Sequence, residues 1–138
     1  MVIQRWQSVL LFLAGLSMCL FAFLPLCDII DKDMLTIVKP INVLPVFIVS
    51  LLTGLLLFIA VFLFRVTHLQ KQLSLAGIIL NICVCAATVL YICNIDAQLG
   101  IIWNWSLCLP PVALVLTIWA IARIRHDENI LKSYDRIR

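Results

Sequence analysis

Charged residues are scarce in this 138-residue chain: Asp, Glu, Lys and Arg together make up 12%, whereas hydrophobic residues make up 64%. Soluble domains use about 25% charged residues and about half apolar residues. A soluble monomer could not bury so much apolar side-chain surface. The composition therefore excludes an ordinary soluble domain and favours a membrane protein.

Four stretches contain no Asp, Glu, Lys, Arg or His at all; they span about residues 6–27, 41–64, 73–93 and 101–122. Lipid offers the backbone no hydrogen-bond partner, so such stretches must be helices. A helix of about 22 residues reaches roughly 33 Å, enough to cross a bilayer. We therefore predict an all-α membrane protein, a single domain over 1–138 built as a four-transmembrane-helix bundle.

The fourth stretch has two interpretations, because Pro110 and Pro111 remove two helical N–H donors. In the first, one helix starts near Ile101 and is kinked at the prolines. In the second, residues 101–109 form an outer interfacial segment and the span starts near Pro110. Both interpretations place the break toward the outer leaflet.

Lys and Arg divide unequally between the two sides of the predicted bundle. Eight of them fall at the two termini and in the middle connection, and Lys32 and Lys39 fall on the other side. The positive-inside rule then predicts that both termini and the middle connection are cytoplasmic. The net charge of +3 follows from this bias, so we expect no nucleic-acid partner.

The last residues, about 123–138, alternate charges with apolar side chains at helical intervals, including Ile130, Leu131, Tyr134 and Ile137. This pattern predicts a C-terminal cytoplasmic amphipathic helix that continues from the fourth span. Such a helix either lies against anionic lipid headgroups or docks on the Arg5 region or a partner protein.

Residues that carry chemistry are also few. The chain has four Gly and two His, with no Gly-rich phosphate loop, no nucleophile elbow and no ligand spacing typical of a metal site. No ionisable side chain lies within the predicted spans, where proton-coupled transporters carry one. We therefore expect no enzymatic activity, no cofactor and no metal.

Polar and sulfur-bearing residues within the bundle leave several alternatives open. Asn81 shares a helix face with Thr88 and either bonds a neighbouring helix or lines a substrate path. Asn81, Asn104 and the proline break would together form a polar pocket near the outer leaflet. Cys27 and Cys93 both approach the outer interface, so they are a candidate disulfide; otherwise the six cysteines act as small hydrophobes.

The two ends of the chain resemble a known family. The opening Met1-Val2-Ile3-Gln4-Arg5-Trp6-Gln7 and the closing His126-Asp127-Glu128, Leu131-Lys132-Ser133 and Asp135-Arg136-Ile137-Arg138 resemble an uncharacterised four-helix membrane protein family of Bacteroidetes-type bacteria. Val2 is an extra residue, and His126 stands where the family has Lys. The resemblance implies a bacterial inner (cytoplasmic) membrane location and a multi-pass topology. It also points to a cytoplasmic interaction surface, where the two termini would pack together, made of Gln4, Arg5, Asp127, Glu128, Asp135 and Arg136.

The favoured function is a non-enzymatic accessory or scaffold subunit of a membrane assembly, with the lipid bilayer and a membrane-protein partner or a second copy as its contacts. A small transporter or channel-like component is the alternative. A membrane thiol oxidoreductase is the third hypothesis, although the chain has no Cys-x-x-Cys.

Overall fold

A computed structural model describes residues 2–31, 34–63, 66–95 and 100–135; within them, the side chains of 2–5, 31, 131, 132, 134 and 135 are not described. In chain order the elements are α1 (Val2–Phe23), β1 (Cys27–Asp31), β2 (Met34–Val38), the 3-10 helix η1 (Pro40–Asn42), α2 (Leu44–Phe62), α3 (Thr67–Cys93), β3 (Gly100–Trp103), the 3-10 helix η2 (Trp105–Cys108) and α4 (Leu109–Asp135).

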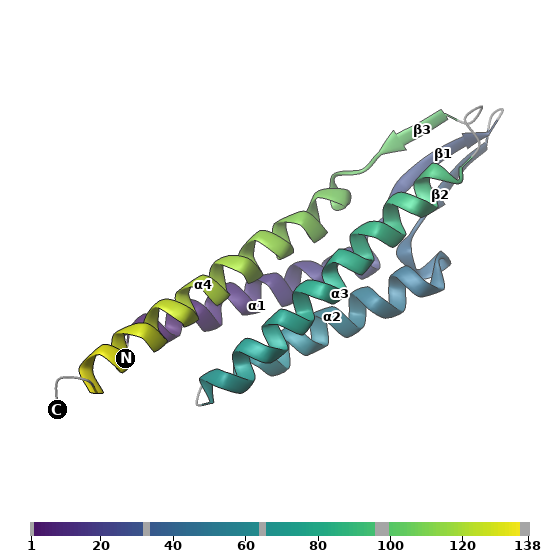
Figure 1. Cartoon of the computed structure of the whole chain (residues 1–138). Helices are drawn as coiled ribbons and strands as arrows, with labels where there is room; N and C mark the ends of the chain where they lie inside the picture. The colour runs from purple at the N-terminus through teal and green to yellow at the C-terminus, as the bar shows by residue number, and fades with distance from the viewer. Residues whose placement is uncertain (1, 32–33, 64–65, 96–99, 136–138) are drawn as a thin grey trace.

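The four helices form an elongated antiparallel bundle (Figure 1). α1 packs against α2 and α4, and α3 packs against the same two helices, with the α3–α4 seam making the fewest contacts. Both chain termini lie at one end of the bundle, which we call the terminal end (Figure 1). The three strands lie at the opposite end, which we call the sheet end.

The sheet is a departure from the predicted all-α fold. Its strand order is β2-β1-β3, with both pairs antiparallel. Cys27 pairs with Val38 on one side and with Trp103 on the other. All three strands contain Ile, and β2 also contains Thr and Val, residue types that favour strands. The strands lie in or next to the segments that we predicted as connections between spans. Strands were not predicted there because the spans were defined only by the absence of charged residues.

Helix boundaries also differ from the charge-free stretches. α1 ends at Phe23, before Cys27, and α3 begins at Thr67, six residues before the predicted span. α4 begins at Leu109, as in the second interpretation, and the residues before it form β3 and η2 instead of one kinked helix from Ile101. Pro110 and Pro111 therefore occupy the first turn of α4, where the missing N–H groups have no helical acceptor anyway.

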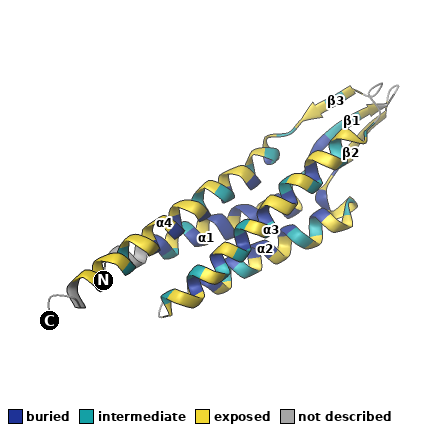
Figure 2. Ribbon diagram, in the orientation of Figure 1, coloured by how far each residue is buried: buried dark blue, intermediate teal, exposed yellow. Residues whose placement is uncertain are grey.

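The core of the bundle is narrow, because each helix buries one face only (Figure 2). α1 and α2 come close where Gly15 faces Gly54: a Cβ built on either glycine would lie 3.3 Å from the carbonyl oxygen of the other. The phenyl rings of Phe12 and Phe58 stack edge to face beside this contact, 5.5 Å apart. Small residues thus let the two backbones approach, as in membrane helix pairs.

All four helices are long and apolar enough to cross a membrane. Their outward faces carry large apolar side chains, such as Ile48, Ile79, Leu90 and Val115, each more than half exposed. The yellow exterior in Figure 2 includes these outward faces. The helices thus present large apolar side chains outward as well as toward the core.

Candidate functional site

The polar side chains of the terminal end meet between helices. We define the terminal-end cluster as Gln7 of α1, Gln70 and Lys71 of α3, and Asp127 and Glu128 of α4. Gln7 lies on the buried face of α1, four residues before Leu11, and is 3% exposed. Its amide Nε2 donates a hydrogen bond to the Asp127 carboxylate. The first and last helices are therefore joined at this end.

Asp127 and Glu128 continue the inward face of α4. Ile121 and Ile124 are buried on that face, and positions three and four residues after Ile124 lie on the same side of a helix. The two carboxylates therefore point toward neighbouring helices, and both side chains are partly buried. This placement suits residues that hold the bundle together.

The second contact of the cluster joins α4 to α3. The Lys71 ammonium lies 3.0 Å from the Glu128 carboxylate, and the two side chains are 28% and 23% exposed. Partial burial reduces screening by solvent and salt compared with a fully exposed pair. Adjacent acids on α4 thus bind two different helices.

Gln70 adds a buried donor to the cluster. It is 1% exposed, and its Nε2 has no hydrogen-bond partner within the part of the chain that the structure describes. Its backbone carbonyl accepts a hydrogen bond from the Ser74 hydroxyl, one turn later. A buried amide without a partner costs about 1–3 kcal/mol, so the cluster holds one donor in excess.

Asn81 forms a polar contact between the middle of α3 and the first turn of α4. Its Nδ2 donates to the Pro110 carbonyl oxygen at 3.2 Å, and its Oδ1 accepts from the Cys85 thiol at 3.7 Å. Thr88 instead returns its hydroxyl to the Val84 carbonyl of its own helix. Of these residues, Asn81 therefore connects two helices.

Asn104 lies outside the helices, in the connection between β3 and η2. Its Nδ2 faces the Asp28 carboxylate on β1 at 3.5 Å. Next to it, the buried Ser106 hydroxyl donates to the Pro25 carbonyl oxygen. These contacts tie the start of α4 to the end of α1 and leave Asn104 separate from Asn81.

Cys27 and Cys93, the candidate disulfide pair, are both free thiols in the structure. Cys27 is fully buried on β1, whereas Cys93 is exposed at the end of α3. Burial, and then the charge of the neighbouring Asp28, raise the pKa of the Cys27 thiol. The thiolate, which is the reactive form, is therefore disfavoured at this position.

Four of the six predicted interaction residues cannot be placed. The side chains of Gln4, Arg5 and Asp135, and the whole of Arg136, lie outside the described residues. Gln7, Gln70 and Lys71 were not predicted as site residues. The sequence contains one indication of Gln7: it is a polar residue four positions before the apolar Leu11, so the two share a helix face, and the structure buries both.

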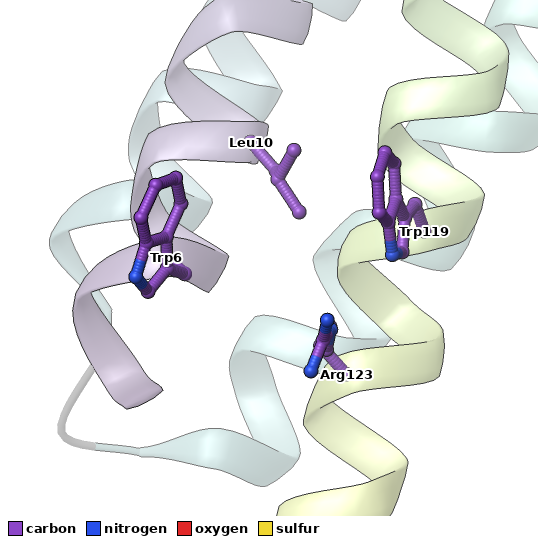
Figure 3. A pocket seen from close by; sticks show the side chains of 4 residues that line it. All are labelled: Trp6, Leu10, Trp119 and Arg123. Atoms are coloured by element: carbon purple, nitrogen blue, oxygen red, sulfur yellow. The ribbon is translucent and has the colours of Figure 1, made fainter. Parts of the chain in front are cut away.

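Described residues line the following two hollows in the bundle. The larger, of about 510 Å³, opens between α1 and α4 near the terminal end and is lined by Trp6, Leu10, Trp119 and Arg123 (Figure 3). The smaller, of about 250 Å³, lies near the sheet end and is lined by Cys85, Thr88, Val89, Ile92, Trp103, Leu107, Pro110 and Pro111. Among the described residues, no group of three His, Cys, Asp or Glu side chains is placed to hold a metal ion.

The chain was compared with protein families, curated proteins and solved structures. A domain of unknown function, DUF4293, matches residues 3–137. Neither the curated proteins nor the solved structures include a match to this chain.

Proposed function

The chain belongs to the DUF4293 family, and from its geometry we propose that it is a four-span protein of the bacterial inner membrane that serves as a non-enzymatic accessory or scaffold subunit. The observation that carries this proposal is the terminal-end cluster. Its contacts from Gln7 to Asp127 and from Lys71 to Glu128 fix the end of α4 against two other helices. These contacts give the end of α4 a fixed position, so its exposed side chains form a defined surface for a partner protein.

The apolar exterior supports the membrane part of the proposal. Exposed apolar patches on soluble monomers rarely exceed a few hundred Å². Here each helix exposes large apolar side chains along its length, for example Leu20 on α1 and Phe62 on α2. Lipid acyl chains would cover this surface, whereas water would not.

The distribution of positive charge supports the orientation. Lys71, Arg123 and Arg125 lie toward the terminal end, and Lys39 lies toward the sheet end. The positive-inside rule then gives cytoplasmic termini. Fusions of alkaline phosphatase and of green fluorescent protein after residue 138 test this. We expect a fluorescent, phosphatase-inactive C-terminus; an active phosphatase there would overturn the orientation.

The projecting part of α4 supports the subunit role. α4 continues for eight residues beyond Asp127, about 12 Å, whereas α3 extends only four residues, about 6 Å, beyond Lys71. Asn129, Ile130 and Ser133 on this extension are exposed. A helix end that is fixed at its base and exposed at its tip suits contact with another protein.

The test of the subunit role is site-specific photocrosslinking in cells. A photoreactive amino acid replaces Asn129 on the extension, and a matched variant carries it at Thr36, which is exposed on β2 at the sheet end. We expect one discrete crosslinked adduct from position 129 and none from position 36. Purification of the partner protein from the same cells should recover the same adduct. Equal labelling from both positions, or none from either, would overturn the proposal.

A second candidate function, a small transporter or channel-like component, is favoured by the 250 Å³ hollow beside Pro110 and Pro111. This hollow lies where the sequence predicted a polar pocket. Its described lining is mostly apolar, however, and it includes neither Asn81 nor Asn104. An apolar solute would suit it better than an ion. Thermal stabilisation of the purified chain by such a solute, lost in Val89→Trp, is the result that would favour transport over the subunit role.

A further inference from the structure

The groove between α1 and α4 combines an apolar wall with one cation. Trp6 and Leu10 on α1 are four residues apart, as are Trp119 and Arg123 on α4, so each helix presents a pair of side chains on one face. The two pairs line the same hollow from opposite sides (Figure 3). Its volume of about 510 Å³ lies within the usual range of ligand pockets, about 300–1,000 Å³.

The groove has a polar end and an apolar end. α1 and α4 run in opposite directions, so Trp6 and Arg123 lie nearer the terminal end, and Leu10 and Trp119 lie deeper in the bundle. Arg123 is also the first charged residue of α4, after fourteen residues without charge from Leu109 to Ala122. A ligand that fits this arrangement has a charged head and an apolar tail.

The positive charge of the groove has no ion-pair partner in the part of the chain that the structure describes. Among the described residues, Arg123 forms no ion pair or hydrogen bond. Asp127 lies one turn further along α4 and keeps its negative charge, but its carboxylate is directed to α1, where it accepts the hydrogen bond from Gln7. In Figure 3 the indole nitrogen of Trp119 lies at the end of the ring nearest Arg123. The groove therefore offers two hydrogen-bond donors, one of them charged, to an anion.

We propose that this groove binds one anionic phospholipid, with its phosphate at Arg123 and the indole N–H of Trp119, and with an acyl chain that runs from there into the bundle along Leu10. The proposal rests on the membrane location proposed above. With the termini in the cytoplasm, Arg123 lies at the inner leaflet, whose anionic lipids attract basic side chains by about 1 kcal/mol each. An amphipathic anion satisfies both ends of the groove, whereas a soluble anion would leave its apolar wall in water.

The test uses quenching of tryptophan fluorescence by brominated lipids. The full chain carries Trp103→Phe and Trp105→Phe, which remove the two exposed indoles of the sheet end and leave Trp6 and Trp119. It is placed in nanodiscs of phosphatidylcholine that contain an increasing fraction of brominated phosphatidylglycerol. A parallel series contains brominated phosphatidylcholine with the same acyl chains. The lipid preference is the quenching constant of brominated phosphatidylglycerol divided by that of brominated phosphatidylcholine.

We expect phosphatidylglycerol to quench about fivefold more strongly, the factor that corresponds to about 1 kcal/mol for one basic residue near an anionic lipid. Arg123→Gln should bring the ratio to about one. Arg125→Gln is the matched control: Arg125 is exposed on the same helix, about 200° around from Arg123, and should keep the preference. Arg123→Lys should restore part of it, which shows that Arg123→Gln acts through charge and not through misfolding.

Equal quenching by the two lipids in the parent chain would overturn the lipid site. A preference that survives Arg123→Gln would also overturn it. A change from dimer to monomer in Arg123→Gln would assign the groove to a second copy of the chain instead. Absence of quenching by either lipid would contradict the membrane location itself, so failure of the lipid site and failure of the proposed function give different results.

Discussion

Gln7 on α1 donates a hydrogen bond to Asp127 on α4, 120 residues later in the chain. Gln7 is buried and Asp127 is partly buried, so each depends on the other for its hydrogen bond. Directly after Asp127, α4 begins the extension on which the proposed subunit role depends. The pair therefore links the stability of the bundle to the position of its exposed end.

Replacement of Gln7 by Leu should destabilise the bundle by about 1.5–3 kcal/mol, because a hydrogen bond to a charged group is lost and the Asp127 carboxylate stays partly buried without its partner. The free energy of unfolding in mixed micelles with increasing dodecyl sulfate measures this. Gln72→Leu is the matched control, since Gln72 is exposed on α3 and should change stability by less than about 0.5 kcal/mol. Equal effects of the two substitutions would contradict the prediction.

The Lys71–Glu128 pair should show a coupling energy of about 0.5–1 kcal/mol in a double-mutant cycle with Lys71→Gln and Glu128→Gln. The coupling should decrease at high salt, because both side chains retain some contact with solvent. Lys39→Gln combined with Glu128→Gln is the control, and these residues at opposite ends of the bundle should show no coupling. A Lys71–Glu128 coupling near zero at low salt would remove the pair from the cluster.

Sequence predicted the helices because the absence of charge over about 20 residues is a strong and local signal. The sheet was missed because strands such as Cys27–Asp31 and Gly100–Trp103 are short, and Asp28 and Asp31 made the first of them resemble an exposed loop. The partner of Asp127 was missed for a different reason. A buried Gln and an exposed Gln look alike until the packing of distant helices is known, and only the structure places Gln7 opposite Asp127.

Gly54→Ala should destabilise the α1–α2 contact, because the added Cβ would lie 2.8 Å from the Cys19 sulfur and 3.3 Å from the Gly15 carbonyl oxygen. Overpacking of this kind costs typically 1–3 kcal/mol. Gly100→Ala is the control: its Cβ would meet Ile30 at 3.5 Å, an ordinary contact. Circular dichroism during thermal unfolding in detergent compares the two. A Gly100→Ala variant less stable than Gly54→Ala would show that the close approach of α1 and α2 does not limit packing.

Asn81→Leu should weaken the α3–α4 seam, because it removes the hydrogen bond to the Pro110 carbonyl oxygen. Hydrogen bonds between membrane helices contribute about 0.6 kcal/mol on average and up to about 1.7 kcal/mol, so we expect a loss in this range. Thr88→Val serves as the control, since the Thr88 hydroxyl bonds its own helix at Val84. If Asn81→Leu leaves stability unchanged but abolishes a transport activity, Asn81 lines a path instead of joining helices.

Cys27 should react slowly with thiol reagents, and its reaction should require a higher pH than that of an ordinary thiol. Burial, and then the Asp28 charge, raise its pKa in the folded chain. An ordinary thiol ionises near pH 8.5. Above that pH the unfolded chain loses this proton while the folded chain keeps it, so folding stability should fall as the pH rises through this range.

Alkylation by iodoacetamide between pH 7 and 10, followed by mass spectrometry, compares a variant that keeps only Cys27 with one that keeps only the exposed Cys93. Equal rates and equal pH dependence in the two variants would show that burial does not protect Cys27.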